Sequence, residues 1–131
     1  MAKNLMVVFT NPVEGREDEF NDWYDNEHLA DVVGGGPFAR AQRFVLADVD
    51  HDVAPDYRYL ALYEIEDGKT FEDARRWIVW SRGEREEALA AGRRPAVPMT
   101  DAIAEQRVSF MYGALAEPFE KPKPGTGDAS G

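Results

Sequence analysis

The chain has 131 residues, of which 44% are hydrophobic and 31% are charged, a length that suits one domain with its own hydrophobic core. It contains no cysteine, which excludes disulfides, thiolate metal sites and cysteine nucleophiles, and its two histidines are too few for a histidine-rich metal cage. The net charge of −10 disfavours binding to nucleic acid or to an anionic membrane surface. We therefore expect a small acidic domain with no nucleic-acid partner and no membrane partner.

The first predicted element is the apolar run Leu5–Thr10, whose β-branched and aromatic residues favour a buried strand. Asn11 and Pro12 end it. The run is too short for the hydrophobic region of a signal peptide, and no apolar stretch approaches the length that spans a bilayer. We expect a cytoplasmic protein.

Residues 15–33 predict a helix, because their aromatic and acid/base side chains recur at spacings of three or four. These side chains are Phe20, Trp23, Tyr24, Glu27, His28 and Asp31. Acidic residues crowd the first turns, where the helix dipole favours negative charge. Three glycines and a proline at residues 34–37 end the helix.

Residues 38–47 and 57–66 predict two strands, and the second alternates clearly. One face of the second strand consists of Tyr57, Tyr59, Ala61, Tyr63 and Ile65. Thr70 is a candidate cap of a second helix, which ends near Gly92. Residues 105–115 predict the last strand.

The predicted order is β-α-β-β-α-β, and the predicted fold class is α+β. The ferredoxin-like solution is an antiparallel four-stranded sheet with both helices on one face. The other face would be apolar and exposed in a monomer, so we expect a homodimer joined sheet to sheet. The domain then spans residues 1–116, and the Pro- and Gly-rich residues 117–131 form a flexible tail.

The segment from Trp23 to Asp31, with the sequence WYDNEHLAD, resembles the EthD-like branch of the dimeric α+β-barrel proteins. In that branch the first helix carries a W-Y-x-x-x-H-type run, and a glycine-containing loop leads to a strand that ends in an R-F-like pair, here Arg43 and Phe44. Residues 5–17 add to the resemblance, which covers roughly residues 5–115. It implies a dimeric α+β barrel. The wider superfamily includes cofactor-free cyclases, dehydratases, decarboxylases, lactone isomerases and oxygenases of aromatic compounds, along with heme-binding branches.

His28 is the first candidate for catalysis, because histidine titrates near neutrality and passes a proton in either direction. Tyr24, one turn earlier, is expected to hydrogen-bond an oxygen of the substrate. Asp31 or Glu27 would orient the imidazole, and Asp31 shares its helix face. The resemblance implies that the matching histidine lies in the cleft. The structural alternative is that His28 caps the helix C-terminus as a cation.

Aromatic side chains are candidates for the walls of a substrate site, although core packing is the alternative for most of them. The candidates are Phe20, Trp23, Tyr59, Tyr63, Trp77 and Tyr112. Arg43 and Arg107 lie in predicted strands, where a charge needs an ionic partner or an anionic substrate group. Arg43 is included in the substrate-binding set, with a salt bridge at the sheet edge or the dimer interface as the alternative for both.

No metal site is predicted. Asp50, His51 and Asp52 lie together, but in a polar loop that contains no further histidine. The glycines of residues 34–36 follow a helix and lack the Gly-Lys-Ser/Thr ending of a phosphate loop. We expect no cofactor.

The combined prediction is a cofactor-independent lyase or isomerase, of the dehydratase or cyclase type, that acts on a hydrophobic aromatic or polyketide-like small molecule. His28 would supply general acid/base catalysis. Two alternatives stay open: a cofactor-independent oxygenase of an aromatic substrate, and a non-catalytic dimer that binds a small molecule. An open cavity that contains both His28 and Tyr24 would favour the enzyme.

Overall fold

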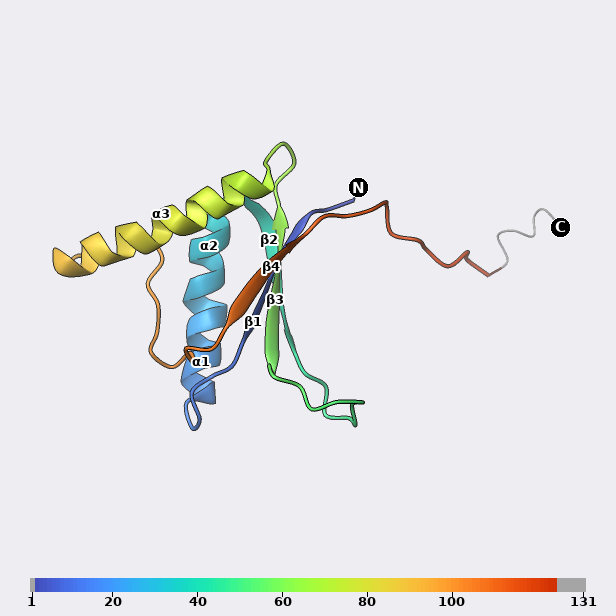
Figure 1. The fold of residues 1–131 in the computed structure, drawn as a ribbon, viewed down its shortest axis with the longest axis horizontal. Coiled ribbons are helices and arrows are strands. Elements are labelled where there is room, and N and C mark those ends of the chain that lie inside the picture. Colours follow the sequence, from blue (N-terminus) through green and yellow to red (C-terminus); the bar gives the residue numbers. More distant parts are fainter. Residues whose placement is uncertain (1, 125–131) are drawn as a thin grey trace.

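The computed structural model describes residues 2–124, which form a four-stranded antiparallel sheet with all of the described helices on one side (Figure 1). The elements are β1 (Leu5–Thr10), α1 (Glu17–Trp23), the π-helical turn η1 (Tyr24–His28), α2 (Leu29–Gly35), β2 (Phe38–Val45), β3 (Tyr59–Ile65), α3 (Phe71–Ala90) and β4 (Val108–Tyr112). The strand order is β2-β3-β1-β4. The predicted α+β class and the ferredoxin-like arrangement are confirmed.

Strand register assigns the side chains of the sheet to two faces. Met6 of β1 lies opposite Tyr63 of β3 and Met111 of β4, so these three residues share the face that the helices cover. The predicted alternation of β3 is confirmed, because its residues are alternately buried and half-buried. Phe110 and Tyr112 of β4 point to the opposite face and are 48% and 53% exposed.

Local sequence determines both ends of α3. The Thr70 hydroxyl accepts a hydrogen bond from the backbone N–H of Asp73 at 3.0 Å, and the Asp73 carboxylate accepts one from the N–H of Thr70 at 2.8 Å. This capping box confirms the predicted cap. At the other end, Gly92 has a φ of +74°, a left-handed conformation that glycine adopts without strain.

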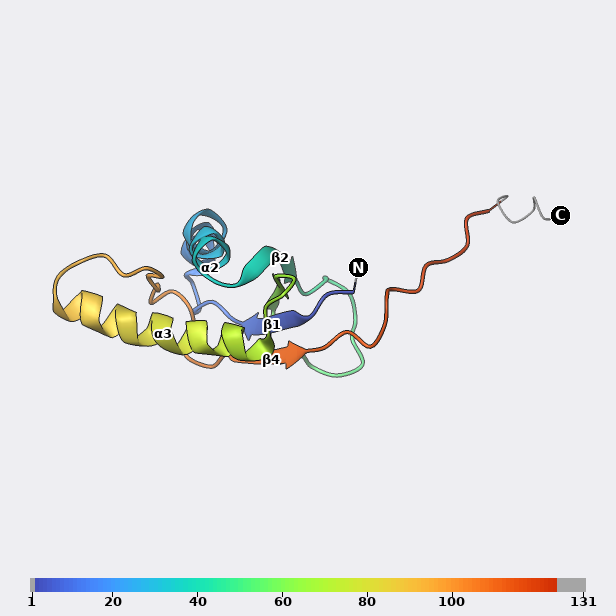
Figure 2. The same cartoon turned by 90° about the horizontal axis from the view of Figure 1, so that it is seen from above.

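The two long helical segments cross on the same side of the sheet. In Figure 2, α2 is seen nearly end-on, whereas α3 lies across the view. The C-terminal half of α3 extends beyond the sheet, and the connection between α3 and β4 returns from there toward α1 (Figure 1). This connection therefore closes the space between α3, α2 and the sheet.

Residues 113–124 contain no helix or strand and lead away from the body of the molecule (Figure 1). The backbone N–H of Ala2 donates a hydrogen bond to the Glu117 carboxylate, close to the start of the predicted tail. Residues 125–131 of that tail lie outside the described residues. No helix within residues 2–124 is long and apolar enough to cross a membrane.

Candidate functional site

The helical segment between β1 and β2 is not a uniform α-helix, because Tyr24–His28 form a π-helical turn. The N–H of Leu29 bonds to the carbonyl of Tyr24, five residues earlier, instead of four. A single turn of this kind inserts one extra residue into a helix and occurs frequently at functional sites. The predicted single helix of residues 15–33 is therefore corrected to α1, η1 and α2, which end at Gly35.

The π-turn brings the ring of Trp23 onto the ring of His28. In an α-helix, residues five apart point about 140° away from each other. Here the two ring centroids are 4.3 Å apart, with an interplanar angle of 27°. The Trp23 indole N–H donates to the carbonyl of Pro98 at 3.3 Å, which fixes the stack. The ring of Tyr24 lies nearly perpendicular to the same imidazole, with 5.0 Å between the two ring centroids.

A cavity of about 330 Å³ lies between α3, η1, α2, the sheet and the segment that precedes β4. Both His28 and Tyr24 line it, together with Tyr63 and Trp77. Its apolar walls come from Met6, Val8, Val32, Ile78, Val97, Met99, Ile103 and Val108. Its further polar side chains are Thr10, Ser81, Arg82, Arg85, Glu105, Arg107 and Ser109. Apolar and polar side chains therefore both line it, a combination that suits a small-molecule site.

His28 is held in its neutral form in this cavity. Burial, and to a smaller extent the positive charges of Arg85, Arg107 and Arg43, lower the pKa of its imidazole to about 4. Its Nδ1 is buried and has no hydrogen-bond partner within residues 2–124. A neutral imidazole in a cavity wall can accept a proton from a bound molecule.

Tyr24 and Tyr63 form a protonated pair beside this imidazole. Burial raises the pKa of Tyr24, and burial raises that of Tyr63 well above its ordinary value. Their hydroxyl groups hydrogen-bond each other. At neutral pH both phenols therefore keep their protons; Tyr63 donates its O–H to Tyr24, and the O–H of Tyr24 remains available to another acceptor.

Three other predicted site residues lie at the opposite end of the space between α1 and the sheet, around Phe20. Phe20 is completely buried and contacts Tyr59 with a centroid distance of 5.2 Å. The Arg43 guanidinium lies over the ring of Tyr24, 4.3 Å from its centroid. Its Nη1 contacts Asp25 at 2.8 Å, so Arg43 has the salt bridge that the sequence left as its alternative role.

Two predicted orienting carboxylates do not contact the imidazole of His28. Asp31 pairs with Arg94 at 3.3 Å, and Glu27 is exposed. The π-turn ends at His28, so it leaves the three-residue helical spacing to Asp31 unchanged, and the ion pair with Arg94 is the observed difference. Tyr112 lies on the sheet face away from the cavity, because its register partner on β1 is Leu5. Trp23 is buried behind His28 and is absent from the described lining.

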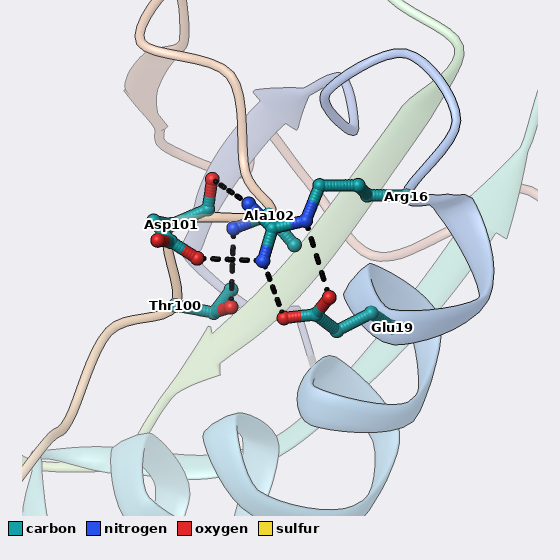
Figure 3. Close-up of polar contacts among 5 residues, drawn as sticks. All are labelled: Arg16, Glu19, Thr100, Asp101 and Ala102. Carbon is teal, nitrogen blue, oxygen red and sulfur yellow. Dashed lines mark hydrogen bonds and ion pairs between the residues drawn. The ribbon is translucent and has the colours of Figure 1, made fainter.

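The segment that closes the cavity, residues 97–109, is anchored at the beginning of α1 by Arg16 (Figure 3). Nη2 of Arg16 lies 2.7 Å from Oδ1 of Asp101, and Nη1 donates to the Asp101 carbonyl at 3.2 Å. The same guanidinium pairs with Glu19 at 2.6 Å. Arg16 therefore ties the first turn of α1 to the segment that supplies Val97 and Met99 to the cavity.

On α3, Trp77 was predicted from the sequence as a wall of the site, whereas Ile78, Ser81, Arg82 and Arg85 were not. Trp77, Ser81 and Arg85 are spaced four residues apart, and Ile78 and Arg82 follow the same spacing, so they share one helix face. That face lines the cavity. The alternation of apolar and cationic residues along this face of α3 was the sequence pattern that could have indicated a cavity wall. Within residues 2–124, no group of histidine and carboxylate side chains could hold a metal ion.

No protein-family model matches the chain. A curated relative, Core atranone cluster (CAC) protein 1 of Stachybotrys chlorohalonatus (strain IBT 40285), is 38% identical over 65 residues. The match covers 48% of this chain and 26% of that protein, so the chain matches about a quarter of its relative's length.

The structure is similar to the crystal structure of an EthD-like protein from Ralstonia eutropha JMP134, with a TM-score of 0.53 and 16% sequence identity. The likeness covers 90% of this chain and 97% of that one. The chain therefore has the fold of an EthD-like protein, as the resemblance in its first helical segment predicted.

Proposed function

We propose that the protein is a cofactor-independent lyase or isomerase that acts on a hydrophobic, aromatic or polyketide-like small molecule by proton transfer at His28. The observation that carries the proposal is the joint presence of His28 and Tyr24 in the wall of one cavity. The similarity to a protein named for the core atranone cluster supports a role in the same kind of cluster.

In this mechanism, the neutral His28 takes a proton from a carbon next to a substrate carbonyl and returns it at another atom. The carbonyl oxygen becomes an enolate, and Tyr24 donates a hydrogen bond to it. The hydroxyl of Tyr63, in turn, hydrogen-bonds Tyr24 and supports that donor. Arg107, which also lines the cavity, contributes positive charge that favours the enolate. Dehydration or ring closure can follow from the same enolate.

The test uses two aromatic ketones with a weakly acidic C–H, 2-tetralone and anthrone, in D₂O. We expect the protein to accelerate deuterium incorporation, measured by ¹H NMR, and His28→Asn to abolish the acceleration. His51→Asn is the matched control, since His51 is exposed in a loop away from the cavity. Equal exchange rates for the wild type and His28→Asn would contradict the proposal. Conversion of anthrone to anthraquinone with oxygen uptake would instead support the oxygenase alternative.

The functional unit in this proposal is a homodimer joined through the uncovered face of the sheet. That face carries apolar residues from three neighbouring strands, and the helices leave it open (Figure 1). Its outward residues include Leu5, Val7, Phe9, Leu60, Leu62 and Phe110. A contiguous apolar surface of this kind marks an interface in a protein of this size.

Light scattering at micromolar concentration tests the dimer. We expect a dimer for the wild type and a monomer for Phe110→Glu, because a carboxylate in the centre of an apolar interface is desolvated without a partner. Val79→Glu is the control, since Val79 is 58% exposed on α3 and should leave the dimer intact. A wild-type monomer would contradict the sheet-to-sheet arrangement.

A further inference from the structure

The charges around the cavity are opposite in sign to those of the chain. The protein has a net charge of −10, yet the cavity is lined by Arg82, Arg85 and Arg107. Glu105 is the single carboxylate among the described lining residues. With a neutral His28, the described lining therefore carries more arginines than carboxylates, and Glu84 and Glu86 on α3 add negative charge near Arg85.

Arginines elsewhere in the described chain are paired with carboxylates. The paired residues are Arg16, Arg40, Arg43, Arg58, Arg76, Arg93 and Arg94. Within residues 2–124, the three cavity arginines have no such pair, and outside the cavity Arg75 is the further exception. Arg75 is exposed on α3 and does not line the cavity, whereas the exposed side chains of Arg82 and Arg107 lie in the cavity wall beside the half-buried Arg85.

Arg85 shows most clearly that the cavity is prepared for an anion. Its Nη1 donates to the carbonyl of Val97 at 2.8 Å, which holds the half-buried guanidinium in place. Its other N–H groups have no protein acceptor within residues 2–124. Burial lowers the pKa of Arg85, and repulsion from Arg107 and Arg82 lowers it further. A ligand carboxylate would remove this repulsion and accept hydrogen bonds from the planar donor group.

We propose that the cavity selects a hydrophobic organic anion, whose charged oxygen group pairs with Arg85 and Arg107 while its apolar body lies against Trp77 and the sheet. This inference rests on the proposed function and specifies its substrate class. The walls exclude an inorganic anion as the preferred ligand, because side chains such as Val8, Ile78 and Met99 need an apolar surface to cover them.

Anion binding also affects His28. The charged groups that act on its imidazole come from three elements: Arg43 on β2, Arg85 on α3 and Arg107 before β4. Tyr24 and Tyr63 face it as neutral phenols, and Glu105 lies on the same cavity. An anion that balances two of the three arginines weakens their effect and raises the pKa of His28. The substrate thus makes the imidazole a stronger base at the moment of binding.

The test compares 2-naphthoate with 2-naphthamide, which has nearly the same shape and no charge, by isothermal titration calorimetry at pH 7. We expect 2-naphthoate to bind at least about tenfold more tightly, which corresponds to one charge-assisted contact. Arg107→Gln should remove that preference, and Arg75→Gln should keep it. Arg107 is substituted instead of Arg85, because Arg85 also donates a hydrogen bond to the carbonyl of Val97 and its loss could shift the cavity wall.

Two results would overturn the proposal: equal affinity for the two compounds, or no binding of either. An equal loss of naphthoate affinity in Arg75→Gln and Arg107→Gln would also overturn it, since that result indicates general charge attraction. The assay is independent of turnover. If 2-naphthoate binds as expected while no ketone exchanges deuterium, the proposed function fails and the anion site stands.

Discussion

The space between the helices and the sheet has two ends that use the same residue types differently. At the packed end, around Phe20, Arg43 contacts three aromatic rings and pairs with Asp25 and Asn21. At the hollow end, around His28, Arg107 has no ionic partner within residues 2–124. The side chain of Tyr24 separates the two ends. The difference indicates that satisfied charges support the fold, whereas unsatisfied charges beside a cavity support binding.

The largest expected effect is at the packed end. Phe20 is 0% exposed, so Phe20→Ala should lower the free energy of unfolding by about 3–5 kcal/mol, the cost of a cavity that the surroundings fill incompletely. Phe20→Leu keeps most of the volume and should cost less. Urea unfolding measures both. A loss below about 1 kcal/mol for Phe20→Ala would show that this end is not well packed.

The second effect concerns the pH dependence of stability at the hollow end. The pKa of His28 is about 4 in the folded protein and near its ordinary 6.5 in the unfolded chain. The unfolded state therefore binds the proton first as the pH falls, and stability that is complete above pH 6.5 is lost progressively toward pH 4. Between pH 7 and 4.5 the contribution is about 2–3 kcal/mol.

Urea unfolding of the wild type and of His28→Asn at both pH values isolates this contribution from that of the carboxylates. The wild type should lose about 2–3 kcal/mol more than the variant. Parallel losses in the two proteins would contradict a buried, neutral imidazole at position 28.

The third and smallest expected effect is the difference in stability loss between substitutions of Arg43 and of Arg107. Arg43→Gln should cost about 2 kcal/mol, because it removes a desolvated cation–π contact and two charge-assisted hydrogen bonds. Arg107→Gln should change stability by less than about 0.5 kcal/mol, because Arg107 has no ionic partner to lose within the described chain. Thermal unfolding of the wild type and of both variants measures these two stability losses. Equal losses would remove the distinction between the packed and the hollow end.

The elements that sequence predicted well are those that local chemistry determines. Alternation predicted the buried face of β3, and Thr70 predicted the start of α3, where Asp73 completes the capping box. Strands β2, β3 and β4 were predicted with ends that extend too far, because pairing partners decide where a ladder stops, whereas the predicted bounds of β1 are those observed.

The site was predicted in part. His28 lies in the cavity wall, as the resemblance implied, and Tyr24 lines the same cavity. The π-turn has no local sequence signature, since an inserted residue is stabilised by tertiary contacts such as the bond from Trp23 to Pro98. Helical spacing favoured contact between His28 and Asp31, whereas in the structure Asp31 pairs with Arg94, which is distant along the chain. Arg43 has ionic and polar partners, whereas Arg107 has no ionic partner within residues 2–124. This difference depends on packing between segments that are distant in the chain, so the spacing of residues along the sequence could not predict it.

The most direct test of the hollow end is a titration of the His28 imidazole by NMR, with and without 2-naphthoate. The chain has two histidines, and His28→Asn assigns the two resonances. Our account predicts a His28 pKa of about 4 in the protein alone and a higher value with the ligand bound. A His28 pKa near 6.5 that does not respond to the ligand would contradict the account, because His28 would then be a solvated side chain outside a working site.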